Sequence, residues 1–124
     1  MYNNQQTPTA VAEKLLPLVS PVTNDQRQSE FQAFDLVTRE LLANKTKAKE
    51  DPEFLRALDD NRRLWHGLEE DLVLPQNQLP DPLKAKIISV AIWVERHTKL
   101  AQHGDATTEP LIKVNESIMK GLAA

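Results

Sequence analysis

The most chemically varied short segment of the sequence is DDNRRLWHGLEED, residues 59–71. It places one amide, Asn61, and two guanidinium groups, Arg62 and Arg63, close to the indole of Trp65. Amides form paired hydrogen bonds, guanidinium groups bind carboxylates or phosphates, and an indole packs against apolar or planar groups. The segment therefore predicts a binding site, a nucleic-acid contact or one face of an ordinary amphipathic helix.

Helical periodicity separates these polar side chains from one another. At about 100° per residue, one apolar stripe contains Phe54, Leu58, Trp65, Leu68 and Leu72. Asn61 falls within that stripe, Arg62 lies on its flank, and Arg63 points to the opposite side. We therefore expect an interior amide, a boundary guanidinium and a solvated charge rather than one basic patch.

A second asparagine occupies a similar position further along the chain. Asn115 lies within the apolar stripe formed by Leu111, Val114, Ile118 and Leu122. A buried amide without partners costs about 1–3 kcal/mol, so Asn61 and Asn115 should bond across the fold, to one another or to the backbone. Such asparagines can fix helix register, as they do in coiled coils, and a direct role in ligand binding is the alternative.

The segment from residue 81 to residue 103 has two apolar sides. One stripe contains Leu83, Ile87, Val90, Val94 and Ala101, and a second, almost opposite, contains Ile88 and Ile92. A helix of this kind is either central in a bundle or exposes a stripe that another chain covers. In the second case Ile88, Ile92, Trp93 and Arg96, with Arg62 as a further candidate, are the expected partner-binding residues.

No pattern in the sequence predicts catalysis or a cofactor. His97 and His103 are six residues apart and diverge on a helix, and His66 lies on another segment without an HExxH motif, so we expect no metal site. The chain has no cysteine, no glycine-rich phosphate loop and no serine elbow. We therefore expect a non-enzymatic protein without cofactors.

The elements that must position these residues are helical. The 124 residues are about one domain in length, and 40% hydrophobic with 27% charged residues is a globular composition. Only three glycines occur, none in a hairpin dipeptide, and the eight prolines fall between the periodic segments. A net charge of -3 disfavours nucleic acid as a direct partner. The sequence shows no secretory signal and no membrane span, so we expect a cytoplasmic protein.

These boundaries predict an all-α, single-domain bundle of about four main helices. The first helix is expected over residues 25–49, with Ala48 on its apolar side. The second should run from an Asp51 N-cap to about Leu72, and the third from an Asp81 cap to about His103. The fourth should start after Thr107 or Thr108 and reach about Leu122. Residues 1–24 form a separate N-terminal arm or short helix, and residues 25–124 form the bundle.

Several of these segments together resemble the bacterial flagellar biosynthesis regulator FlaF family. The similar segments are FQAFDLVTRELL at 31–42, NRRLW at 61–65, PQNQLP at 75–80, WVERHT at 93–98 and PLIKVNESIMKGL at 110–122. They place Asn61, Trp65, His97 and Asn115 in signature segments, over about residues 25–123.

The resemblance implies a cytoplasmic protein needed for flagellin production and export. The implied partner is flagellin, which the protein would bind as an export chaperone and positive regulator of flagellin synthesis, with functional interplay with the FlbT regulator. A chaperone would cover the amphipathic terminal helices of unassembled flagellin. The alternative is an RNA-binding post-transcriptional regulator of flagellin messenger RNA, using Arg62, Arg63, Arg96 and Lys99. A third possibility is a module that uses its spare apolar stripe to form a homodimer.

Overall fold

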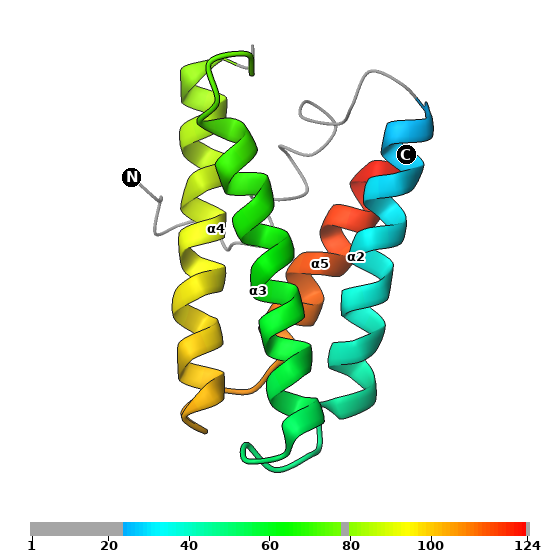
Figure 1. Ribbon diagram of the computed structural model, residues 1–124, viewed down its shortest axis with the longest axis vertical. Helices are drawn as coiled ribbons and strands as arrows, with labels where there is room; N and C mark the ends of the chain where they lie inside the picture. Colours follow the sequence, from blue (N-terminus) through cyan, green and yellow to red (C-terminus); the bar gives the residue numbers. More distant parts are fainter. Residues whose placement is uncertain (1–23, 78–79, 124) are drawn as a thin grey trace.

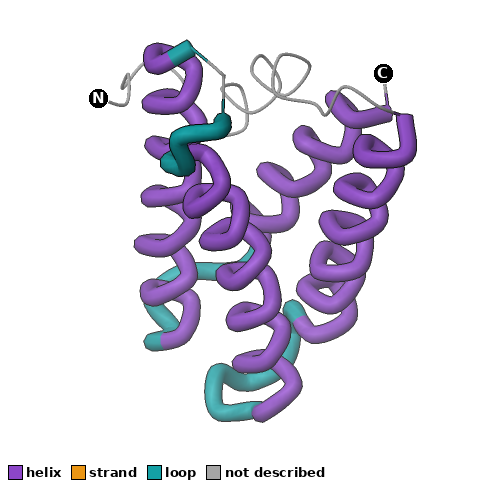
Figure 2. The backbone as a smooth tube through the Cα atoms, turned by 45° about the horizontal axis from the view of Figure 1, so that its top comes forward, coloured by secondary structure: helices purple, strands orange, loops and turns teal. Residues whose placement is uncertain are grey.

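A computed structural model of the chain describes residues 24–77 and 80–123. Within these ranges the chain forms helices α2 (Asn24–Asn44), α3 (Pro52–Leu72), α4 (Asp81–Gln102) and α5 (Glu109–Ala123), joined by short loops (Figures 1 and 2). The predicted all-α class is confirmed. The predicted N-terminal arm lies outside the described residues except for Asn24, which begins α2.

The start of α3 follows the predicted cap. Asp51 is the N-cap residue, its Oδ1 accepts a hydrogen bond of 2.8 Å from the Glu53 N–H, and Pro52 occupies the first turn. Proline suits that position because the first helical N–H groups have no intrahelical acceptor. The helix therefore begins where the sequence indicates.

The predicted cap of α4 is wrong. Pro80 occupies the N-cap position without a side-chain cap, and Asp81 is already helical. Asp81 contributes instead as a negative charge in the first turn, where the helix macrodipole favours it. At the other end α4 stops as predicted, because Gly104 adopts a left-handed φ of 79° and donates its N–H to the Ala101 carbonyl at 3.1 Å.

The first helix is shorter than the sequence predicts. It ends at Asn44, whose side-chain Nδ2 donates a 2.8 Å hydrogen bond to the Glu40 carbonyl oxygen four residues earlier. The Lys47 N–H then donates to the Asn44 carbonyl at 3.0 Å and closes a turn. Ala48 consequently lies in the loop and is exposed, not on an apolar helix face.

The start of α5 selects between the two predicted caps. The Ile112 N–H donates to the Thr108 carbonyl at 3.1 Å, which makes Thr108 the residue that accepts the first bond of the helix. Thr108 is also buried, whereas Thr107 is exposed.

The helices form two neighbouring pairs, α3 with α4 and α2 with α5, and α2 also packs along α3 (Figures 1 and 2). The α4 helix meets α5 over a much smaller contact, and the backbones of α2 and α4 stay apart. The α4 helix is thus an edge element, and the interpretation that placed it at the centre of the bundle is wrong. The core between the helices includes Leu41, Leu58, Val90, Val94, Leu111 and Ile118.

Candidate functional site

Three buried polar side chains connect α3 to α5 across the bundle. Asn115 Nδ2 donates to Asn61 Oδ1 at 2.7 Å, and Trp65 Nε1 donates to Asn115 Oδ1 at 3.0 Å. The Trp65 ring also meets Phe34 of α2 edge to face, with centroids 5.7 Å apart. The prediction that the two asparagines bond across the bundle is confirmed, and so is the interior position of Trp65, which is 2% exposed.

This amide–indole network is closed to solvent. Asn61 and Asn115 are both 0% exposed, so an outside molecule does not reach either amide. One donor is left over, because Asn61 Nδ2 has no acceptor among the described residues. The network is therefore asymmetric: Asn115 uses both ends of its amide, whereas Asn61 uses one.

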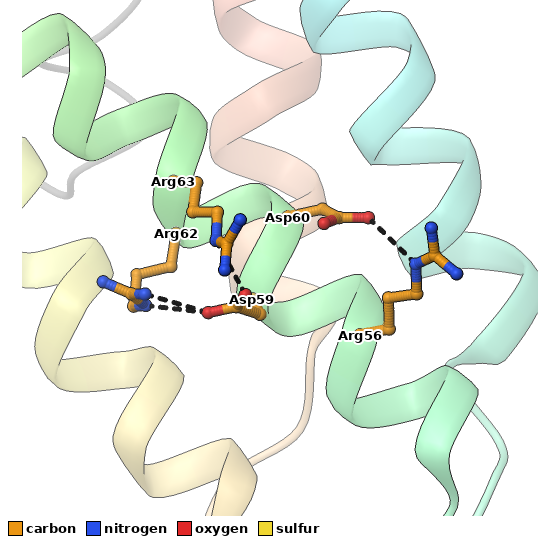
Figure 3. A network of polar contacts seen from close by, with 5 residues as sticks. All are labelled: Arg56, Asp59, Asp60, Arg62 and Arg63. Atoms are coloured by element: carbon orange, nitrogen blue, oxygen red, sulfur yellow. Dashed lines mark hydrogen bonds and ion pairs between the residues drawn. The ribbon is translucent and has the colours of Figure 1, made fainter.

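The two arginines of the opening segment share one carboxylate. Arg62 donates to Asp59 Oδ1 from Nε at 3.2 Å and from Nη2 at 2.9 Å, and Arg63 Nε lies 2.9 Å from Asp59 Oδ2 (Figure 3). The Arg62 side chain is 33% exposed and extends toward α4, where Glu95 lies, whereas that of Arg63 is 73% exposed. The predicted boundary and solvent positions of the two arginines are confirmed.

The charges of Asp59, Arg62 and Arg63 interact, and this interaction shifts the pKa values of Asp59 and Arg62. The hydrogen bond from Arg62 holds the pKa of the Asp59 carboxyl below its usual value, with further lowering by the charge of Arg63. The same bond raises the pKa of Arg62, and Glu95 adds to that rise. Within α3 the single Asp59 carboxylate cancels one of the two positive charges, so the pair of guanidinium groups offers a phosphate about half of its formal charge.

The side of α3 that faces α2 carries a second charge group. Arg56 Nε lies 3.9 Å from Asp60 Oδ2 (Figure 3), and Glu40 of α2 lies beside Asp60. Burial raises the pKa of Glu40, and the neighbouring Asp60 carboxyl raises it further. The ion pair thus lies within α3, and the contact between α3 and α2 here is between two carboxyl groups.

The predicted partner-binding residues of α4 have mixed environments. Ile92 is 42% exposed and Arg96 is exposed, whereas Ile88 and Trp93 are half-buried and pack against the core. Leu100, which the sequence reasoning missed, is 46% exposed and lies two helical turns beyond Ile92. We refer to Ile88, Ile92, Trp93, Arg96 and Leu100 as the α4 outer face.

His97 connects this face to the loop before α5. Its ring stacks on Trp93 with centroids 5.0 Å apart, and its Nε2 donates to the Thr107 carbonyl oxygen at 2.7 Å. Because a carbonyl only accepts, the Nε2 atom carries a proton in this contact. His97 thus holds both the Trp93 ring and the α4–α5 loop in place.

A groove between α2 and α3 was not predicted. It has a volume of about 520 Å³ and is lined by Ser29, Glu30, Ala33, Phe34, Arg63, Leu64, Gly67, Leu68 and Asp71. The one sequence signal for it is Gly67, a glycine in the middle of an otherwise strong helix. The sequence reasoning assigned no role to that residue.

Two further properties concern the described ranges alone. Within residues 24–77 and 80–123, no group of three or more histidine or acidic side chains is arranged to hold a metal ion. No helix in the same part of the chain has the length and apolarity needed to cross a membrane.

The fold and these sites define an all-α bundle protein with a closed amide–indole network and an apolar edge helix. The family model for flagellar protein FlaF matches residues 18–122, so the chain belongs to the FlaF family. The match begins before residue 25, where the resemblance in the sequence begins. This membership assigns the protein a role connected with the flagellum. Searches of curated proteins and of solved structures find no match to the chain.

Proposed function

We propose that the protein is a non-enzymatic, cytoplasmic chaperone that binds flagellin before export and thereby promotes flagellin synthesis and flagellum assembly. Membership of the FlaF family supports the flagellar part of this proposal. The observation that carries the chaperone part is the α4 outer face, an apolar surface on an edge helix that no other described helix covers.

The chemistry of the α4 outer face suits a helical client. Ile92 and Leu100 offer exposed apolar area, and Arg96 adds a long cationic side chain between them. Aromatic and arginine residues commonly dominate binding energy, and Trp93 is held rigid by its stack on His97. An amphipathic flagellin helix laid along α4 would bury this row as an added helix of the bundle.

RNA binding is less well supported by the same geometry. Arg62 and Arg63 share the single Asp59 carboxylate, and Arg96 and Lys99 are the other cations of that hypothesis. A few separate cations on an acidic protein provide little of the electrostatic attraction on which phosphate binding depends. A gel shift on flagellin leader RNA that weakens steeply with salt would favour the RNA alternative over the chaperone.

Calorimetry with purified flagellin tests the proposal. We expect wild-type protein to bind full-length flagellin and to bind less tightly, or not at all, to flagellin that lacks its C-terminal helix. Ile92→Asp should weaken binding by about tenfold or more, because it places a charge in a desolvated contact. Leu42→Asp is the matched control, since Leu42 is 40% exposed on α2 and Ile92 is 42% exposed on α4.

Two results would count against this reasoning. If wild-type protein fails to bind flagellin, the chaperone function is wrong. If Ile92→Asp and Leu42→Asp bind equally well while both remain folded by circular dichroism, the client does not use the α4 outer face. Light scattering of the protein alone separates a client-binding monomer from a homodimer built on that face.

A further inference from the structure

The groove between α2 and α3 is a second apolar surface, and every described residue that lines it belongs to one of these two helices. It lies between the first half of α2 and the second half of α3, at the end where these two helices separate (Figure 1). Phe34, Leu64 and Leu68 provide its apolar lining, and all three also contact the hydrophobic core. At about 520 Å³ the groove has room for side chains from one face of a helix.

Gly67 keeps one wall of the groove open. A Cβ atom added at Gly67 would meet no atom within 4 Å. Packing within the described chain therefore does not require a glycine here, although a glycine inside a helix destabilises it by about 1 kcal/mol relative to alanine. A close approach by another backbone or side chain would explain why the wall stays open at this position.

The charges in and beside the groove are mainly acidic. The last turn of α3 contains Glu69, Glu70 and Asp71 and no basic residue, although a helix C-terminus favours cations. His66 approaches Glu69 and Glu70 at 3.8 Å and 3.5 Å, but it does not pair with Asp71.

Glu30 and Asp71 are the two carboxylates that line the groove itself. Burial raises the pKa of Glu30, and the charge of Asp71 raises it further. Arg63, the cation of the lining, is engaged with Asp59 at 2.9 Å. Among the residues whose side chains the structure describes, no lysine or arginine lies within ion-pair distance of either groove carboxylate, and the Asp71 carboxylate accepts a 3.4 Å hydrogen bond from Asn77 Nδ2.

We propose that the α2–α3 groove binds an amphipathic helix of a partner protein, whose apolar face packs over Gly67 and whose lysine or arginine pairs with Glu30 and Asp71. The partner's apolar side chains would cover Leu64 and Leu68, and its cation would neutralise two carboxylates that now repel one another. This surface is distinct from the α4 outer face, and the partner is defined by its chemistry. The inference therefore goes beyond the proposed function and does not depend on flagellin as the client.

A pair of synthetic peptides tests this chemistry directly. Both would have the same apolar helical face, flanked by lysines in one peptide and by glutamates in the other. Titrated into isotope-labelled full-length protein, the lysine peptide should shift the amide signals of Ser29, Ala33 and Gly67, and the glutamate peptide should not. Gly67→Leu should weaken binding of the lysine peptide by about tenfold or more, since the leucine side chain fills the space that the peptide needs. His66→Leu adds the same side chain at the neighbouring exposed position outside the groove and should bind normally.

The isosteric pair Glu30→Gln and Asp71→Asn tests the charge without changing shape. Together they should weaken binding of the lysine peptide by about tenfold and make that binding insensitive to salt. Circular dichroism melting of each variant separates loss of binding from loss of fold. Equal binding of both peptides, or unchanged binding by Gly67→Leu, would overturn the proposal.

Two other occupants of the groove give distinct results. If residues 1–23 fill it, the full-length double variant Leu15→Asp, Leu16→Asp should shift the Gly67 amide without any peptide. If a second copy fills it, light scattering should show a dimer that Gly67→Leu abolishes. Either result would overturn the assignment to a partner helix, and neither depends on whether flagellin binds elsewhere.

Discussion

Replacement of the two buried asparagines should have unequal effects on stability. Asn115→Ala removes the acceptor of the Trp65 indole N–H and the donor to Asn61 Oδ1, so two buried polar groups lose their partners. Asn61→Ala leaves one group unpaired, Asn115 Nδ2, and also removes the Asn61 Nδ2 donor that already lacks an acceptor.

The expected magnitudes follow from the number of polar groups left unpaired. One buried donor or acceptor without a partner costs about 1–3 kcal/mol, so Asn115→Ala should lower the free energy of unfolding by about 2–6 kcal/mol and Asn61→Ala by about 1–3 kcal/mol. The double variant leaves only the Trp65 N–H unpaired. Its loss should therefore be smaller than the sum of the single losses by about 2 kcal/mol or more. Each single variant also leaves a cavity of similar size, so the free-energy cost of the cavity largely cancels when the two single variants are compared.

Urea unfolding followed by far-ultraviolet circular dichroism measures these quantities. The wild type, both single variants and the double variant form one thermodynamic cycle. The reasoning is refuted if Asn115→Ala is no more destabilised than Asn61→Ala. An additive cycle, within about 0.5 kcal/mol, would likewise show that the two amides do not depend on one another.

Three further predictions concern single positions. Gly67→Ala should raise the free energy of unfolding by about 0.5–1 kcal/mol in chemical denaturation, because the added Cβ meets no atom within 4 Å. Glu30→Gln should stabilise the protein near neutral pH but not near pH 4. Because the pKa of Glu30 is raised in the folded state, the protonated Glu30 carboxyl contributes stability to the fold below the ordinary pKa of 4.5. That contribution is lost as pH rises through the folded-state pKa. Melting curves across that pH range would contradict this if the variant and wild type stay parallel. Asp51→Ala should lower stability by about 0.5–2 kcal/mol through loss of its cap to Glu53, and Asp51→Asn, which keeps an acceptor, should lose less in the same thermal melts.

The interior of the bundle could be predicted from the sequence because helical periodicity fixes the direction in which each side chain points from its helix. Asn61, Trp65 and Asn115 each fall within an apolar stripe, and each is buried in the structure. Periodicity also predicts that each amide bonds across the bundle, but it leaves open whether the partner is the other amide or the backbone. It does not predict which amide has a donor left over, because that depends on how α3 and α5 are offset.

The wrongly predicted helix boundaries, the end of α2 and the start of α4, depend on local backbone and side-chain interactions. The apolar pattern continues past Asn44 to Ala48, but α2 ends at Asn44, where the side-chain amide competes with the backbone for the Glu40 carbonyl. At α4, an acidic residue before a proline suggests a cap, yet the helix starts one residue earlier, with Pro80 as the cap. In both places one hydrogen bond or one dihedral angle decides the boundary, and periodicity does not contain that information.

The surfaces were the least predictable part. The position of α4 at the edge of the bundle follows from which helices pack together, and its sequence alone allowed a central position as well. The α2–α3 groove requires residues near 30 and near 67 to lie opposite one another, a juxtaposition that exists only in the folded chain. Only Gly67 marked it in the sequence.

The hydrogen bond from Trp65 to Asn115 joins residues separated by 50 positions, on two helices whose backbones do not pack directly. Its indole proton can exchange with solvent only when α3 and α5 move apart, an opening that would involve much of the bundle rather than one fraying end. The rate of that exchange therefore reports how often the whole structure opens. Trp93, half-buried against His97 at the edge, has its own indole signal, which reports on α4 alone. With two tryptophans in the chain, one spectrum thus distinguishes local breathing of the edge helix from global opening of the bundle.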